Sequence, residues 1–147
     1  VCSSDLGLYG NTQGSVLRKL NGAVNYARTQ AMLQGQTWVM RVDLQKSEML
    51  LLSQKELQKE KQGLGQQKWR SFDPLVIRDI QDEKGDTLTN DIFDIYFNPN
   101  GLASPAIIHF ADQDNEPVQT VRLKPFNRKI ATYAGYVSYE DIFAQKK

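Results

Sequence analysis

The sequence predicts an α+β domain in which one N-terminal α-helix packs on antiparallel β-sheets that form a small sandwich. Three observations support this fold class. Apolar residues near the N-terminus recur with the period of a helix, whereas those after residue 36 alternate with the period of a strand. From residue 69 onward, short apolar runs follow one another. Turn residues, including Pro and Gly, fall between these runs, as in antiparallel β-structure.

The helix is predicted over residues 15–34. Its apolar positions are spaced 4, 3, 1, 3 and 4 residues apart, which places them on one helix face. Ser15 can cap the N-terminus, and Gly35 is the residue type that ends a helix in the left-handed conformation. Because half of these apolar residues are alanines, we expect the helix backbone to approach a sheet closely. The predicted packing face consists of Val16, Leu20, Ala23, Val24, Ala27 and Ala31.

The rest of the chain is predicted to form strands. Alternation indicates a strand over residues 37–44, which residues 48–52 join as a hairpin. Residues 53–67 hold two leucines among polar and charged side chains, which favours a long exposed connection with room for one frayed helical turn. In the turn at residues 98–101, Gly101 is expected to take a positive φ. Further strands are expected at 68–72, 75–80, 92–97, 106–110, 118–123, 129–133 and 136–139.

The chain has 147 residues, 40% hydrophobic and 24% charged, which is typical of one globular domain. We expect residues 1–14 to be an N-terminal stub, a boundary scar followed by a hinge, and residues 15–147 to be the domain. The lone Cys2 cannot form an intramolecular disulfide. No run of apolar residues approaches the roughly 18 that a transmembrane helix needs.

Charge is unevenly distributed along the chain, although the net charge is only +1. Residues 1–70 carry ten basic and five acidic side chains, residues 71–116 two and ten, and residues 117–147 six and two. The central acidic block argues against a uniformly basic surface for nucleic acid. A local patch near Phe126 is a weaker alternative to an ordinary solvated strand surface. It would consist of Arg122, Lys124, Arg128 and Lys129.

Catalytic and metal-binding functions find little support. His109 is the one histidine, so a zinc site of His and Cys ligands cannot be assembled, and we interpret it as a strand histidine with a hydrogen-bond partner. The chain has neither a phosphate-binding glycine loop nor a serine nucleophile motif. No enzymatic activity and no cofactor are therefore predicted.

Residues 112–116 place three carboxylates at alternate positions, as the first half of a calcium loop does. Pro117 then stands where such a loop needs glycine, and no glutamate follows at the twelfth position. An acidic turn is the favoured interpretation, and weak cation binding stays open as an alternative.

Three strings, in this order, resemble a known family. They are the helix end at residues 27–35, a Phe-Asn-Pro-Asn-Gly turn at 97–101 and a Gly-Tyr-Val string at 135–137. With the helix-then-strands layout, the chain resembles the soluble part of the H-type minor pseudopilins of bacterial type II secretion and the related minor type IV pilins. The resemblance covers roughly residues 15–139. The residues that match the family pattern are Ala27, Arg28, Ala31, Gly35, Phe97, Pro99, Gly101, Gly135 and Val137.

The resemblance implies a structural subunit near the tip of a secretion pseudopilus, which assists export of folded proteins across the outer membrane. Its partners would be other minor and major pseudopilins, and its head would lie in the periplasm. An apolar N-terminal helix, not present in this chain, would anchor it in the inner membrane. DNA is not an expected partner.

Two other functions stay open. One is a minor type IV pilin that helps to initiate pili or takes up DNA. The other is a secreted carbohydrate- or small-molecule-binding β-domain. That domain would need an exposed aromatic platform. Trp38 and Trp69 are the candidates for it, but we expect both in the core.

Overall fold

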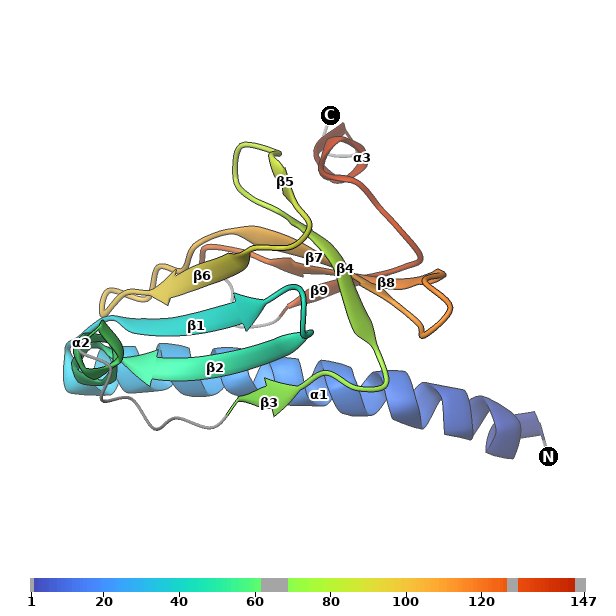
Figure 1. Ribbon diagram of the computed structural model, residues 1–147, viewed down its shortest axis with the longest axis horizontal. Helices are drawn as coiled ribbons and strands as arrows, with labels where there is room; N and C mark the ends of the chain where they lie inside the picture. The colour runs from blue at the N-terminus through green and yellow to red at the C-terminus, as the bar shows by residue number, and fades with distance from the viewer. Residues whose placement is uncertain (1, 62–68, 127–129, 145–147) are drawn as a thin grey trace.

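The computed structural model describes residues 2–61, 69–126 and 130–144 (Figure 1). A long helix comes first, two antiparallel sheets follow, and a short helix ends the described chain. The elements in chain order are α1 (Cys2–Gln34), β1 (Trp38–Asp43), β2 (Glu48–Ser53), α2 (Gln54–Lys61), β3 (Arg70–Ser71), β4 (Val76–Gln81), β5 (Thr87–Leu88), β6 (Ile92–Phe97), β7 (Ala106–Ala111), β8 (Pro117–Leu123), β9 (Ala131–Ala134) and α3 (Tyr139–Ala144).

The strands form a four-stranded sheet in the order β3-β2-β1-β6 and a five-stranded sheet in the order β5-β4-β7-β8-β9. The described strand pairs are antiparallel. In the first sheet, Met40 of β1 lies opposite Leu51 on one side and Ile95 on the other. The predicted α+β class, with a helix followed by antiparallel sheets, is confirmed.

Helix α1 shares one hydrophobic core with both sheets. Figure 1 shows α1 lying along the first sheet, with its N-terminal part extending past the strands. The six residues of the predicted packing face are each at most 4% exposed. They belong to a single buried cluster with Met40 and Phe97 of the first sheet and Ile108 and Phe110 of the second. Both sheets are therefore held against the same helix face.

The N-terminus of α1 differs from the prediction. The helix runs unbroken from Cys2, through the expected stub and hinge, and Ser15 lies inside it rather than at its cap. The glycines and serines of this stretch disfavour a helix by about 1 kcal/mol or less each, and that is not enough to end one. The C-terminal end agrees with the prediction, because Gly35 has a φ of 64° just after the last helical residue.

Helix α2 occupies part of the stretch that was predicted to be an exposed connection. Its N-terminus is closed by a capping box, in which the Glu56 amide donates to Ser53 Oγ over 3.2 Å and the Ser53 amide donates to Glu56 Oε1 over 3.1 Å. This pairing satisfies two amides that the first helical turn leaves without partners. The prediction of no more than one frayed turn was therefore wrong, although the Ser-x-x-Glu signal is in the sequence.

The C-terminal part also differs from the prediction. Residues 136–138 are not a strand, and α3 begins at Tyr139. The short strand β5 was not predicted, and β3 is only two residues long. The strand predicted at 92–97 matches β6, and Gly101 in the following turn has the expected positive φ, at 92°.

Substituting Ala27 with Asp should unfold the head at a lower temperature. Ala27 has no exposed surface, so an unpaired carboxylate there should destabilise the fold by about 3–5 kcal/mol. Gln30→Glu is the control. Gln30 is half-buried on the same helix, and its Oε1 accepts a bond from Gln34 that a carboxylate can also accept. Thermal unfolding followed by circular dichroism should show a large loss for Ala27→Asp and little for Gln30→Glu. Equal melting temperatures would contradict the assigned packing face.

Candidate functional site

Helix α1 has a second face that its own head leaves open. Its positions are exposed and are spaced 3, 1, 3, 4, 3 and 4 residues apart, so they form one stripe opposite the alanines. We call this stripe the outer face of α1. It runs along the head and is available to another molecule. Its residues are Ser15, Arg18, Lys19, Gly22, Tyr26, Thr29 and Leu33.

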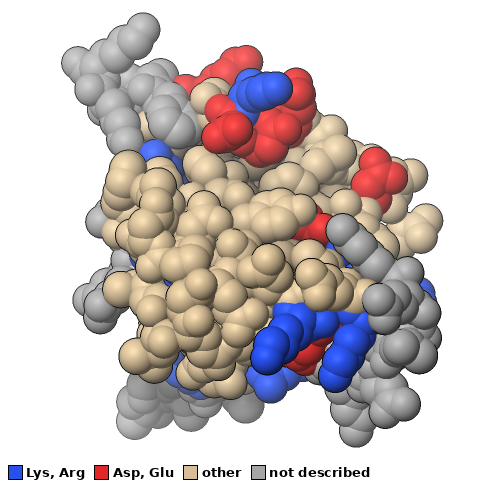
Figure 2. Space-filling model, turned by 90° about the vertical axis from the view of Figure 1, so that its left-hand side faces the viewer, with Lys and Arg blue, Asp and Glu red and all other residues tan. Residues whose placement is uncertain are grey.

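One end of the head has almost no charge. Residues 29–40, at the end of α1, and residues 95–108, around the β6–β7 turn, contain no Lys, Arg, Asp or Glu. The two segments meet where Thr37 Oγ1 lies 3.5 Å from Asn98 Oδ1. Figure 2 shows a broad uncharged surface at this end of the molecule, with charged side chains towards its margins.

Three apolar side chains are exposed at this uncharged end. Met32 is 46% exposed, Leu33 75% and Phe126 76%. Met32 and Phe126 line the same shallow hollow, together with the turn at residues 100–102. Exposed apolar side chains that gather on an uncharged surface are typical of a protein–protein contact.

The family-pattern residues build this end of the head. Ala27, Ala31 and Phe97 have no exposed surface. Arg28 is 4% exposed, and its Nη2 donates to the carbonyl of Lys124 over 3.4 Å. This bond ties α1 to the end of β8. Two of the pattern's glycines, Gly35 and Gly101, provide the positive φ angles of the turns here, and Pro99 is exposed in the β6–β7 turn.

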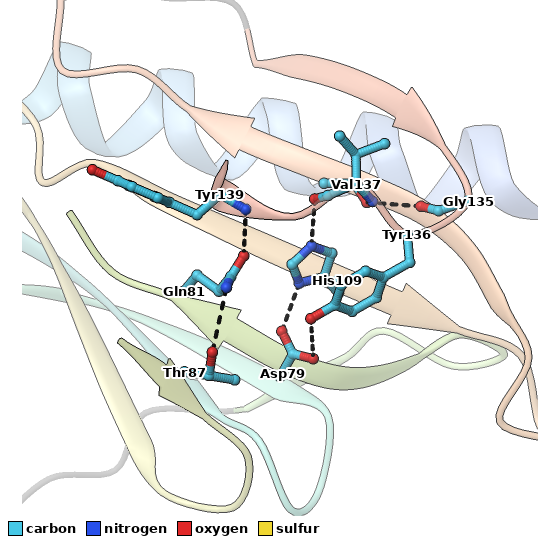
Figure 3. A network of polar contacts seen from close by, with 9 residues as sticks. Asp79, Gln81, Thr87, His109, Gly135, Tyr136, Val137 and Tyr139 are labelled. Carbon is cyan, nitrogen blue, oxygen red and sulfur yellow. Dashed lines mark hydrogen bonds and ion pairs between the residues drawn. The ribbon is translucent and has the colours of Figure 1, made fainter. Parts of the chain in front are cut away.

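The other two pattern residues, Gly135 and Val137, lie on the far face of the second sheet. Gly135 has a φ of 71°, and its carbonyl accepts a bond from Thr120 Oγ1 over 2.7 Å. The Val137 amide donates to the same Thr120 Oγ1 over 2.9 Å, and the Tyr139 amide donates to Gln81 Oε1 over 2.8 Å. Residues 135–139 are thus attached to buried side chains of β4 and β8 (Figure 3). We call them the C-terminal strap.

His109 is at the centre of this network. Its Nδ1 lies 2.6 Å from Asp79 Oδ1, and its Nε2 lies 2.7 Å from the carbonyl of Val137. A carbonyl can only accept, so Nε2 carries a proton. The ring has no exposed surface and stacks on Tyr136 at 3.7 Å. With both nitrogens occupied, His109 joins the strap to the sheet and cannot serve as a general base in this arrangement.

Tyr136 lies over the His109–Asp79 pair. Its hydroxyl donates to Asp79 Oδ2 over 3.1 Å, and Arg78 Cζ lies 5.6 Å from its ring centroid. Burial raises the pKa of Tyr136 above its ordinary value, and the charge and hydrogen bond of Asp79 raise it further. Arg78 acts in the opposite direction. The neutral phenol is therefore the form that suits this site.

The alternative sites suggested by the sequence gain no support from the described residues. Arg122 is only 8% exposed, so it does not contribute to a basic surface, and Arg128 and Lys129 lie outside the described residues. In the acidic turn, Asp112 Oδ1 accepts bonds from the amides of Asp114 and Glu116. Among the described residues, no three His, Cys, Asp or Glu side chains converge as metal ligands would.

The proposed aromatic platform is also not formed. Trp38 is 7% exposed and packs edge-on against Tyr26, with ring centroids 5.7 Å apart. Trp69 is 36% exposed, so its predicted place in the core was wrong.

Sequence reasoning missed the polar network around His109. Asp79 and Thr120 lie in strands that it assigned on apolar pattern alone, and Gln81 lies one residue past the predicted strand 75–80. The available signal was the sequence of β7, in which His109 is the only polar residue and no polar side chains alternate with the apolar ones. The structure buries all six residues of this strand. A strand that is apolar on both faces must be covered on both faces, one by the core and the other by a further segment of the chain. Polar side chains on the second face are candidates for binding that segment.

Comparisons with known proteins find one matching family model and solved structures of similar fold. The sequence model described as "Type II transport protein GspH" matches residues 17–125. Two structures of the minor pseudopilin EpsH from the type II secretion system of Vibrio cholerae are similar in fold. One has a TM-score of 0.64 at 16% identity and covers 88% of this chain and 99% of that chain. The other has a TM-score of 0.63 at 15% identity, over 86% and 99%.

The solution structure of E. coli GspH is also similar, with a TM-score of 0.55 at 15% identity over 86% of this chain and 91% of that chain.

A search of curated protein sequences finds no match. None of the described helices has the length and apolar character needed to cross a membrane.

The raised pKa of Tyr136 predicts a loss of stability in alkali. The unfolded chain releases the phenol proton near pH 10, whereas the folded chain retains it to higher pH. The stability that this group contributes is therefore complete below about pH 10 and is lost as pH rises through the folded pKa. Urea unfolding between about pH 9 and 11 should show a steeper loss for the natural chain than for Tyr136→Phe. Parallel stability curves would contradict the role given to Tyr136.

Proposed function

Since this chain belongs to the GspH family of type II transport proteins, the H-type minor pseudopilins, we propose that it is a minor subunit near the tip of a type II secretion pseudopilus. In that position it moves with the filament and assists export of folded proteins across the outer membrane. The family match over residues 17–125 is the observation that carries the proposal. The tip position is what the family resemblance implies.

The surfaces of the head support a role in assembly. The outer face of α1 is open along the head, and the uncharged end presents Met32, Leu33 and Phe126. Exposed apolar side chains suit a surface that a neighbouring subunit covers, and Arg28, which lines the hollow beside Met32 and Phe126, is only 4% exposed. Other minor and major pseudopilins are the partners proposed for these two surfaces.

We also propose that the natural protein is anchored in the inner membrane, with its head in the periplasm. The anchor would be an apolar helix of about 20 residues that continues α1 at its N-terminus. Two features support this arrangement. Helix α1 is already continuous from Cys2, and its N-terminal part extends past the strands (Figure 1).

The role is proposed to be structural rather than catalytic. His109 is the chain's only histidine, and it is enclosed beneath Tyr136 with both nitrogens hydrogen-bonded. Its contacts hold the C-terminal strap in place. The described side chains contain no cluster of metal ligands that could supply another kind of chemistry.

The experiment is export by the natural host after deletion of the gene. We expect type II substrates to remain in the periplasm and the full-length gene to restore their release. Leu33→Lys should fail to restore it. Leu33 is 75% exposed at the end of α1, where a cation suits the helix dipole, so the variant head should melt like the natural one.

Thr89→Lys is the matched control, because it adds the same charge at an exposed position outside both surfaces. It should restore export. Normal export in the deletion strain would contradict the proposal. If the deletion removed surface pili or DNA uptake instead, the minor type IV pilin would be the better assignment.

A further inference from the structure

A groove lies between α1 and the edge of the first sheet, and Trp38 lines it where it meets the uncharged end. Its walls come from the outer face of α1, the start of α2 and the edge strand β3. The residues that line it and matter here are Arg18, Lys19, Gly22, Tyr26, Glu56 and Arg70. We call it the α1–β3 groove. It is open to solvent and is separate from the polar network around His109.

The groove has an excess of positive charge. Arg18, Lys19 and Arg70 are exposed, and none of them forms an ion pair with a described acid. Lys19 Nζ donates to the carbonyl of Ser71 over 3.1 Å. Glu56 is the one acid among the described lining residues, and its Oε1 is engaged in the capping box of α2. The groove is therefore complementary to a ligand that carries carboxylates.

Gly22 leaves the middle of the groove open. A glycine inside a helix is less favourable than alanine by about 1 kcal/mol. A Cβ added at Gly22 would meet no atom within 4 Å among the described residues apart from its own helix neighbours. The packing of the described head therefore does not require glycine here. A bare helix backbone does allow another chain to approach closely.

An aromatic wall stands beside this opening. Tyr26 is 52% exposed and packs edge-on against Trp38. Trp38 Nε1 donates to Gln34 Oε1 over 3.3 Å, which fixes the indole. A fixed, half-exposed tyrosine offers apolar area at low entropic cost and is frequent at protein interfaces.

We propose that the α1–β3 groove is the docking site for an acidic peptide segment of a neighbouring subunit. Carboxylates of the segment pair with Arg18, Lys19 and Arg70, its backbone crosses Gly22, and an apolar side chain rests on Tyr26. That the neighbour is a pseudopilin rests on the proposed function. Nucleic acid fits less well, because three cations around the Glu56 carboxylate can neutralise few phosphates, and such binding fails at physiological salt.

The test uses the 147-residue chain and a fluorescent peptide of about twelve residues, rich in glutamate with one central leucine. Its binding should shift the amide NMR signal of Gly22 and the indole signal of Trp38. Arg18→Glu combined with Arg70→Glu should weaken binding at least about tenfold, as expected for reversed charges at an interface. Gly22→Leu should also weaken it, by filling the groove without unfolding the head.

Lys84→Glu is the control, since Lys84 is exposed on the β4–β5 turn outside the groove. It should leave binding unchanged. An equal loss for Lys84→Glu would show non-specific attraction and overturn the proposal, as would absence of shifts at Gly22 and Trp38. Tighter binding of a single-stranded oligonucleotide at the same signals would replace the peptide by nucleic acid.

The outcome is distinguishable from failure of the proposed function. Loss of export on gene deletion, together with absence of peptide binding, would retain the pseudopilin and remove the docking site. Peptide binding together with normal export would retain the groove and overturn its assignment to a pseudopilin neighbour.

Discussion

Close packing of the alanine face of α1 is the constraint on which the rest of the head depends. Small side chains at Ala23, Ala27 and Ala31 bring the helix backbone near the strands, where larger residues would hold the two apart. One buried cluster then includes residues from α1 and from both sheets, so the sheets are held by the helix as well as by each other. The same arrangement directs the opposite face of α1 outward over the whole length of the head. One face of α1 therefore packs the head, and the opposite face is exposed for assembly.

The second sheet depends on a different interaction. The outer face of β7 is covered by the C-terminal strap, which is attached through His109, Thr120 and Gln81 rather than through a strand ladder. Buried polar groups destabilise a fold unless they are hydrogen-bonded, and here each of these three side chains has partners. Such contacts are directional, so the strap has a defined position over the sheet. Apolar burial attaches the core-facing side of this sheet to α1, and hydrogen bonds attach the C-terminal strap to its opposite side.

The sequence was sufficient to predict those elements whose signals lie within a few neighbouring residues. The end of α1 at Gly35 and the strand at 92–97 follow from periodicity and turn chemistry within a few residues. The sequence was insufficient to predict segments whose hydrogen-bond partners lie far away along the chain. Residues 136–138 have an apolar-polar pattern that suits a strand, but their bonds go to side chains of β7 and β8, which no local window contains. Arg122 was placed on a solvent face, whereas it is only 8% exposed, and the residue pattern of β8 by itself does not show that burial. The family resemblance was available from the three strings, whereas the α1–β3 groove depends on α1, α2 and β3 meeting in space.

Native-state hydrogen exchange of α1 tests the central claim most directly. If the helix shares one core with both sheets, the amides of residues 20–31 should exchange only by global unfolding, with the same free energy and the same urea dependence as the slowest amides of β1 and β7. The amides of α3 should exchange by local opening, because the short helix lies outside that cluster. Exchange of residues 20–31 at a lower free energy and with a smaller urea dependence than the slowest strand amides would show that α1 detaches from an otherwise folded head, and would contradict the account.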